Sequence, residues 1–248
     1  MRTAVVIPSY NEAENLPKLF SALFALPLDL HVLVVDDNSP DGTGRVADEL
    51  AAAHPDHVRV LHREGKLGFS SAYLQGFRLV LEDPSIEAVA QMDADYSHDP
   101  SALPAMIDKL ADCDVVLGSR YVKGGGVDER WPFWRKGLSA WANFYARTVL
   151  RLPLRDVTTG YRLWRREALA GMPFERIQAN GYIFLVETAY LAYCLKYRFG
   201  EVPIYFADRR WGKSKMSLRI QVEAALRVWQ VLREYRDIQR LGEKARVK

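Results

Sequence analysis

The chain has 248 residues, of which 49% are hydrophobic and 26% charged, a composition typical of a globular protein that buries one full core. Residues 1–119 carry 19 Asp and Glu against 8 Lys and Arg, whereas residues 120–248 carry 12 against 26. The chain has two cysteines, too few for a disulfide framework. No stretch reaches the roughly 20 apolar residues that span a bilayer. We therefore expect a protein of a reducing compartment, without a spanning segment or signal peptide, whose basic half meets an anionic partner.

Short apolar runs alternate with helical patterns through the first half of the chain. Strands are predicted at residues 4–7, 31–35, 58–61, 86–92 and 115–117, and helices at 15–26, 43–53, 70–81 and 100–110. The strands are almost continuously apolar, as expected of parallel strands that are covered on both faces. This order predicts an α/β fold, a doubly wound, mostly parallel sheet with helices on both faces. Ligands of such sheets bind beyond the carboxyl ends of the strands.

Polar and acidic side chains follow three of these predicted strands. They are Pro8, Tyr10 and Glu12 after the first strand, Asp36 and Asp37 after the second, and Asp93 and Asp95 after the fourth. A single Asp after a strand often caps the next helix, so each motif alone has a structural interpretation. Carboxylates that gather at one edge repel each other unless a cation offsets them, and Mg²⁺ and Mn²⁺ prefer such oxygen ligands. Because the sequence has no glycine-rich phosphate loop, we expect a diphosphate to be held through a metal.

The second half of the chain has a different composition. After the glycines at 124–126, residues 130–155 place six aromatic side chains among six basic ones. Three interpretations are open: a packed core, an interfacial helix on a membrane, or a platform for nucleic-acid bases, which the acidic strand ends would repel. A helix at 182–195, a strand at 201–206 and a basic loop at 209–217 follow. From residue 218 the apolar positions keep a 4-3-4-3 spacing, which predicts an amphipathic C-terminal helix.

Several motifs resemble a known family in the same order along the chain. They are VIPSYNE at 6–12, VVDDNSPDGT at 34–43, GKLGFSS at 65–71, DAD at 93–95 and GSRYVKG at 118–124. Together they resemble the GT-A-like nucleotide-sugar domain of inverting family-2 glycosyltransferases. The segments DVTTG at 156–160 and RRWGKSKM at 209–216 resemble the acceptor side of dolichyl-phosphate (polyprenyl-phosphate) mannose synthases. The resemblance therefore covers nearly the whole chain.

The resemblance implies a set of site residues. Nucleotide-sugar contacts fall on Pro8, Tyr10, Glu12, Val35, Asp37, Asp93, Ala94, Asp95, Arg120, Arg209 and Lys215, and acceptor contacts on Arg120, Thr159, Gly160, Arg209 and Lys215. The catalytic group would be Asp93, Asp95, Arg120, Arg209 and Lys215, with Mg²⁺ or Mn²⁺ on the two aspartates. Close relatives often carry Gln as a further metal ligand two residues after the second Asp, where this chain has Ser97. The identity of the third protein ligand is therefore left open.

The resemblance also implies a reaction, the transfer of mannose from GDP-mannose to a polyprenyl or dolichyl phosphate, with inversion to a β-linked product. A phosphate monoester is largely ionised at neutral pH, so the acceptor needs surrounding cations more than a general base. The alternative within this class is a glucosyltransferase that uses UDP-glucose. An alternative from another class is a nucleotidyltransferase, which usually has a Gly-, Arg- and Lys-rich loop after the first strand, where this chain has none.

We expect one compact catalytic domain with three segments. Residues 1–120 would bind the nucleotide sugar and the metal, residues 121–217 would bind the acceptor and contain the interfacial segment and the basic loop, and residues 218–248 would form the amphipathic helix. The expected partners are the donor, the lipid acceptor, a membrane surface and a separate membrane-anchoring protein, but no nucleic acid. The expected location is cytoplasmic, peripheral at the cytoplasmic face of a membrane.

Overall fold

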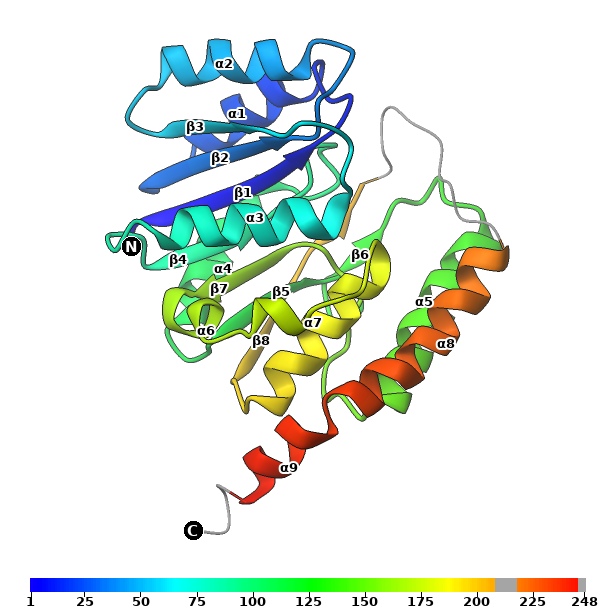
Figure 1. Cartoon of the computed structure of the whole chain (residues 1–248). Helices are drawn as coiled ribbons and strands as arrows, with labels where there is room; N and C mark the ends of the chain where they lie inside the picture. The colour runs from blue at the N-terminus through cyan, green and yellow to red at the C-terminus, as the bar shows by residue number, and fades with distance from the viewer. Residues whose placement is uncertain (208–217, 245–248) are drawn as a thin grey trace.

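The computed structural model describes residues 1–207 and 218–244, and its centre is a seven-stranded sheet (Figure 1). The strands follow the order β3-β2-β1-β4-β7-β5-β8. Their bounds are β1 (Thr3–Ser9), β2 (Leu30–Asp36), β3 (Val58–His62), β4 (Ala88–Gln91), β5 (Val115–Ser119), β7 (Arg162–Arg165) and β8 (Phe199–Pro203). All neighbours pair in parallel except β7, which runs antiparallel to β4 and β5. A short second sheet pairs β6 (Gly126–Val127) with β9 (Tyr205–Phe206).

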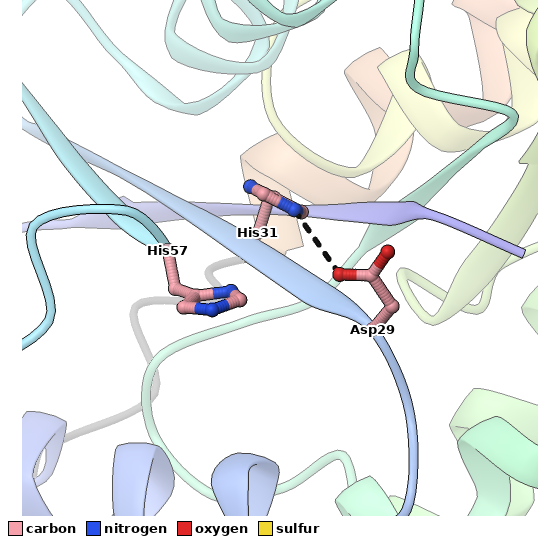
Figure 2. Close-up of side chains that lie close together, drawn as sticks. All are labelled: Asp29, His31 and His57. Carbon is pink, nitrogen blue, oxygen red and sulfur yellow. Dashed lines mark hydrogen bonds and ion pairs between the residues drawn. The ribbon is translucent and has the colours of Figure 1, made fainter.

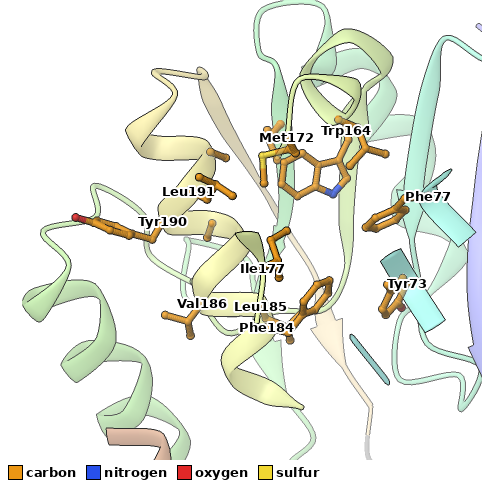
Figure 3. Packing of buried hydrophobic residues seen from close by; sticks show 14 of the residues in the cluster. Tyr73, Phe77, Trp164, Met172, Ile177, Phe184, Leu185, Val186, Tyr190 and Leu191 are labelled. Carbon is orange, nitrogen blue, oxygen red and sulfur yellow. The ribbon is translucent and has the colours of Figure 1, made fainter. Parts of the chain in front are cut away.

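Helices cover both faces of the large sheet and bury one apolar layer on each. One layer lies under α1 (Leu16–Phe24), α2 (Thr43–Ala53) and α4 (Leu103–Leu110). The other lies under α3 (Phe69–Leu81), α6 (Arg166–Ala170) and α7 (Tyr182–Cys194). In this second layer, Tyr73 and Phe77 of α3 face Phe184 of α7 and Trp164 of β7 (Figure 3). Short 3₁₀ turns at Pro100–Ala102 and Phe174–Arg176 complete the connections. The predicted α/β class with helices on both faces is therefore confirmed.

A pair of helices lies beside the sheet. Helix α5 (Phe133–Val149) packs along α8 (Leu218–Glu234), and α9 (Arg236–Lys244) continues from it (Figure 1). The Tyr145 hydroxyl joins the pair, because it donates to the Ala225 carbonyl at 3.0 Å and accepts from Trp229 Nε1 at 2.9 Å. None of the helices in the described ranges is long and apolar enough to cross a membrane.

Several elements differ from the sequence-based expectation. The helix expected from residue 218 is divided into α8 and α9, and β6 and α6 were not predicted. The strand expected at 201–206 is divided between two sheets, since β8 ends at Pro203 and β9 begins at Tyr205. Strand β7, which lies inside the sheet between β4 and β5, is absent from the prediction. Its sequence is RLWR, and no apolar pattern reveals it. The buried Arg162 satisfies its guanidinium with protein oxygens, so its burial is invisible to hydrophobicity.

Candidate active site

The strand order predicts where on the large sheet a ligand would bind. β1 lies between β2 and β4, so the chain winds away from β1 in both directions. In doubly wound sheets ligands bind at this switch point, outside the carboxyl ends of the strands. The loops after β1 and β4, which carry Glu12 and Asp95, lie on the two sides of this point.

The loops after β1 and β2 are fastened to each other. The Asn11 backbone N–H donates to Ser39 Oγ at 3.1 Å, and that of Glu12 donates to Thr43 Oγ1 at 2.8 Å. Asn11 and Asn38 both adopt left-handed backbone conformations, with φ of 63° and 57°. Asn tolerates this region better than most residues, which explains the residue type at both turns. The loops after β1 and β2 are therefore held together as one rigid unit.

Asp37 is held by an internal partner. Its carboxylate forms a buried ion pair with Arg63 and accepts the Gly68 backbone N–H at 3.0 Å. The same loop carries Lys66, whose Nζ lies 3.6 Å from the centre of the Tyr10 ring. The loop after β3 thus closes over Tyr10, and a cation lies beside the expected nucleoside contacts. Sequence reasoning assigned Asp37 to the ligand and missed Arg63 as its partner.

Asp93 lies where the two halves of the chain meet. The Tyr73 hydroxyl of α3 donates to its Oδ1 at 3.1 Å, and its backbone N–H donates to His98 Nδ1 at 3.0 Å. The side chain stays 20% exposed. A Cβ added at Gly160 would lie 3.6 Å from Asp93 Oδ2 and 3.1 Å from the His98 ring, so the backbone of Thr159 and Gly160 approaches this carboxylate closely. Two segments expected on the donor and acceptor sides are thereby brought together.

Asp95 lies among oxygen groups of the kind that divalent ions prefer. It is almost buried, and its Oδ1 accepts the Ser97 backbone N–H at 3.0 Å. The Ser97 hydroxyl is buried and has no hydrogen-bond partner among the described residues. Tyr96 between them has a φ of 63°, a costly conformation for an aromatic residue that often accompanies functional sites. Two carboxylates and an unsatisfied hydroxyl form an oxygen donor set that fits Mg²⁺ or Mn²⁺.

Arg120 has a protein carboxylate as its counter-ion. It binds Asp156 through Nε at 2.7 Å and Nη2 at 2.8 Å, and it also reaches Thr158 Oγ1 at 2.7 Å. Asp156 is fully buried; burial disfavours its charged form, but the Arg120 guanidinium outweighs this and lowers the pKa of Asp156. Arg120 therefore holds the 156–160 segment, and its expected contact with phosphate stays a prediction.

The other expected residues divide into three groups. Pro8 lies half-buried at the end of β1, at the switch point. Val35 and Ala94 have buried side chains, so only their backbone is available to a ligand. Arg209 and Lys215 lie outside the described residues.

Arg162 is a buried residue beside the candidate site that the sequence analysis did not name. It is fully buried and donates to the carbonyls of Val157, Thr159 and Leu185 and to Thr188 Oγ1. Burial lowers the pKa of Arg162 to about 10, so the group remains charged at neutral pH. It fixes the 156–160 segment on α7, and its only signal in the sequence is its place two residues after Gly160.

A series of aromatic contacts connects His98, which lies beside Asp93, to helix α5. The His98 ring lies 5.7 Å from Phe206, and Phe206 lies 5.8 Å from the buried Trp131. The Arg135 guanidinium of α5 stacks on Trp131 at 3.8 Å. The start of α5 is therefore held within a few side chains of Asp93.

Comparison with known proteins agrees with this geometry. Residues 4–171 match the family described as glycosyl transferase family 2. The polyprenol monophosphomannose synthase of Mycolicibacterium smegmatis is 45% identical over 217 residues, 87% of this chain and 81% of that protein. The undecaprenyl-phosphate mannosyltransferase of Micrococcus luteus is 43% identical over 228 residues, 92% of this chain and 93% of that protein.

A solved structure with a similar fold is a mannosyltransferase from Pyrobaculum calidifontis in complex with GDP-Man and Mn²⁺. The TM-score is 0.60 at 19% identity, and the match covers 98% of this chain and 68% of that one. At this identity the likeness shows the fold, and it agrees with a GT-A-like arrangement. Since the family match extends over more than half of the sequence and two relatives exceed 40% identity, the chain belongs to glycosyl transferase family 2.

Proposed function

We propose that this glycosyltransferase moves mannose from GDP-mannose to the phosphate of a polyprenyl phosphate, such as a dolichyl phosphate, with inversion to a β-linked product. The observation that carries the proposal is the similarity, over most of both chains, to two enzymes named for polyprenyl-phosphate mannosyl transfer. The approach of the 156–160 segment to Asp93 supports it, because donor and acceptor must meet beside the metal-binding carboxylates.

The proposed metal ligands are Asp93 and Asp95, with the Ser97 hydroxyl as the third protein group. A bound Mg²⁺ or Mn²⁺ would supply charge neutralisation for the departing nucleoside diphosphate. The chain's own residues orient these ligands: Tyr73 fixes the Asp93 carboxylate, and the Ser97 backbone N–H fixes that of Asp95. The donor base and sugar would lie along the loop after β1, which carries Tyr10 and Glu12.

For the acceptor we propose that some residues supply positive charge and another positions the binding segment. Its phosphate is already ionised, so it needs cations and orientation rather than a base. Arg209 and Lys215 would supply the charge. Arg120 would act through Asp156 by keeping Thr159 and Gly160 in place, since its own charge is neutralised inside the protein.

The proposed docking surface on the membrane is the aromatic face of α5, which consists of Phe133, Trp134, Trp141 and Phe144. These side chains are 93%, 70%, 56% and 61% exposed. At 3.6 residues per turn they fall within an arc of about 100°, and Lys136 and Arg147 border that arc. Exposed aromatics bordered by cations suit the interface of an anionic bilayer. We propose peripheral attachment at the cytoplasmic face, near the headgroup phosphates.

A donor screen tests this function. Purified protein with a short polyprenyl phosphate and Mn²⁺ should release GDP from GDP-mannose, and proton coupling constants of the product should show a β-linkage. UDP release from UDP-glucose instead would assign glucosyl transfer, and pyrophosphate release from a nucleoside triphosphate and a sugar phosphate would assign nucleotidyl transfer.

Matched variants make the screen specific to the acidic edge. Asp95→Ala should remove most of the activity and the Mn²⁺ dependence of donor binding. Asp99→Ala changes an exposed acid of the same loop whose carboxylate caps a short turn, and it should retain activity. Donor affinity of Asp95→Ala that equals the wild type both in Mn²⁺ and in EDTA would contradict the metal assignment.

A further inference from the structure

Two histidines and an aspartate gather at the edge of the sheet opposite the acidic motifs (Figure 2). Asp29 and His31 lie at the start of β2, and His57 immediately precedes β3. The parallel register pairs Val32 with Val58, so the residues before them, His31 and His57, are neighbours across the strands. Their ring centres are 5.0 Å apart.

The ligand atoms already have separations close to those of a metal site. One ligand atom from each of Asp29, His31 and His57 lies within 4.8 Å of the other two. His31 Nε2 lies 3.2 Å from Asp29 Oδ1. Two ligands bonded tetrahedrally to Zn²⁺ at about 2.0–2.2 Å lie roughly 3.3–3.6 Å apart. A metal ion can therefore replace the proton between these two atoms with little rearrangement.

Outer contacts orient the ligands. The carbonyl of Leu30 only accepts, so His57 donates to it from Nδ1 at 3.1 Å, which leaves Nε2 as the ligand atom. Asp29 accepts from Arg2 Nε through Oδ2 at 3.3 Å, which leaves Oδ1 for a metal. Arg2 is itself held by Ser85 Oγ at 2.9 Å. Metal sites typically show this support, an imidazole donating to a carbonyl and a carboxylate that is hydrogen-bonded from outside.

The three side chains are also open to solvent ions. Asp29 and His57 are exposed and His31 is half-buried, beside a cavity of about 380 Å³ that both histidines line. Imidazole nitrogens favour Zn²⁺ and similar transition ions, whereas the all-oxygen set at Asp93 and Asp95 favours Mg²⁺ or Mn²⁺. Two sites of different chemistry can thus coexist in one chain.

We propose that Asp29, His31 and His57 form a second metal site, for a divalent transition ion such as Zn²⁺, at the amino ends of β2 and β3. This site lies at the opposite end of the strands from Asp93 and Asp95, about 20 Å away, which is the length of β2. A bound ion would join the starts of β2 and β3 and, through Arg2, the start of β1. It would stabilise the folded chain because the unfolded chain lacks the assembled ligands.

Titration of the full-length protein with Zn²⁺ alone, against a chelating indicator, tests the proposal. The wild type should bind one Zn²⁺ that raises its melting temperature. His31→Ala and His57→Ala should each weaken binding at least tenfold and abolish the rise. Melting temperatures without metal show whether the variants are folded.

Two further variants locate the ion. His54→Ala removes an exposed histidine three residues from His57 that is stacked on Phe24 outside the cluster, and it should bind Zn²⁺ like the wild type. Asp95→Ala should also retain the ion. Wild-type protein that binds no Zn²⁺ would overturn the proposal, as would His31→Ala and His57→Ala proteins with wild-type affinity, or an ion lost only in Asp95→Ala.

Discussion

The Tyr73 hydroxyl donates to the Asp93 carboxylate, and the Tyr73 ring packs against Phe184 in the core that Figure 3 shows. Its hydrogen bond orients the Asp93 carboxylate. Tyr73→Phe should therefore lower kcat about tenfold, the value of a net hydrogen bond near 1–1.5 kcal/mol, and should raise the Mn²⁺ concentration needed for half-maximal activity. Activity measured against Mn²⁺ concentration gives both values.

Tyr161→Phe is the matched control for this change. The Tyr161 hydroxyl is also buried, but it has no hydrogen-bond partner among the described residues. Its removal should leave the Mn²⁺ dependence unchanged and stability equal or slightly higher. If the two variants shift the Mn²⁺ dependence equally, Tyr73 has no special role in positioning Asp93.

At the residue scale, the sequence identified the acidic groups but not their partners. Asp93 and Asp95 were predictable because polar residues directly after a buried strand must lie at its end. Arg63 is 26 positions from Asp37, and Asp156 is 36 positions from Arg120. Partners at such separations follow from the packing of whole elements, which local patterns do not contain. The sequence therefore marked Arg120 as a candidate ligand contact without revealing its counter-ion within the protein.

At the element scale, the Arg120–Asp156 pair fastens the end of β5 to the 156–160 segment. Asp156→Asn leaves a buried guanidinium without its counter-ion and should reduce the free energy of unfolding by about 3–5 kcal/mol. Asp114→Asn breaks the more exposed pair with Arg198 and should cost less than about 1 kcal/mol. Urea unfolding of both variants at neutral pH measures the difference, and equal costs would contradict the assigned role.

The same pair sets a pH dependence. The folded-state pKa of Asp156 is lowered, so its stabilising effect is present above the unfolded pKa near 3.9 and is lost as pH falls through the folded value. The stability difference between wild type and Asp156→Asn should thus stay constant from pH 7 to 5 and shrink below about pH 4. A difference that shrinks between pH 7 and 5 would point to another group.

Elements with regular apolar patterns were predictable, and the exception has a physical cause. All five strands of the first half appear in the sheet. β7 was missed because two of its four residues are arginines: Arg162 is buried on carbonyl oxygens, and Arg165 donates to the carbonyls of Leu110 and Cys113. A strand that satisfies buried charge with backbone oxygens has the local sequence of an exposed loop.

At the scale of the whole molecule, the proposed membrane attachment depends on the aromatic face of α5, whose side chains are exposed. The interpretation that most aromatics of residues 130–155 are core is wrong, since Phe133, Trp134, Trp141 and Phe144 are exposed. Trp131 is buried and cannot take part. Trp134→Ser with Trp141→Ser should weaken binding to anionic liposomes by at least about tenfold, because each indole loses more than 1 kcal/mol of apolar burial.

Co-sedimentation with liposomes across a salt series measures this effect. Wild-type binding should weaken as salt rises, and the double variant should keep its donor affinity and melting temperature. Trp131→Ser is the contrasting change and should lower the melting temperature instead. Wild-type protein that ignores anionic liposomes yet glycosylates a water-soluble short acceptor would leave docking to a separate membrane protein.

The antiparallel β7 between β4 and β5 has a consequence for synthesis on the ribosome. When a nascent chain has emerged only to residue 120, β4 can pair with β1, but its other neighbour β7 lies more than 40 residues further on. Until residues 162–165 arrive, the side of β4 that later pairs with β7 presents unpaired backbone groups to other nascent chains. Chaperone protection is therefore needed most in this interval, and slow translation there would prolong the exposure.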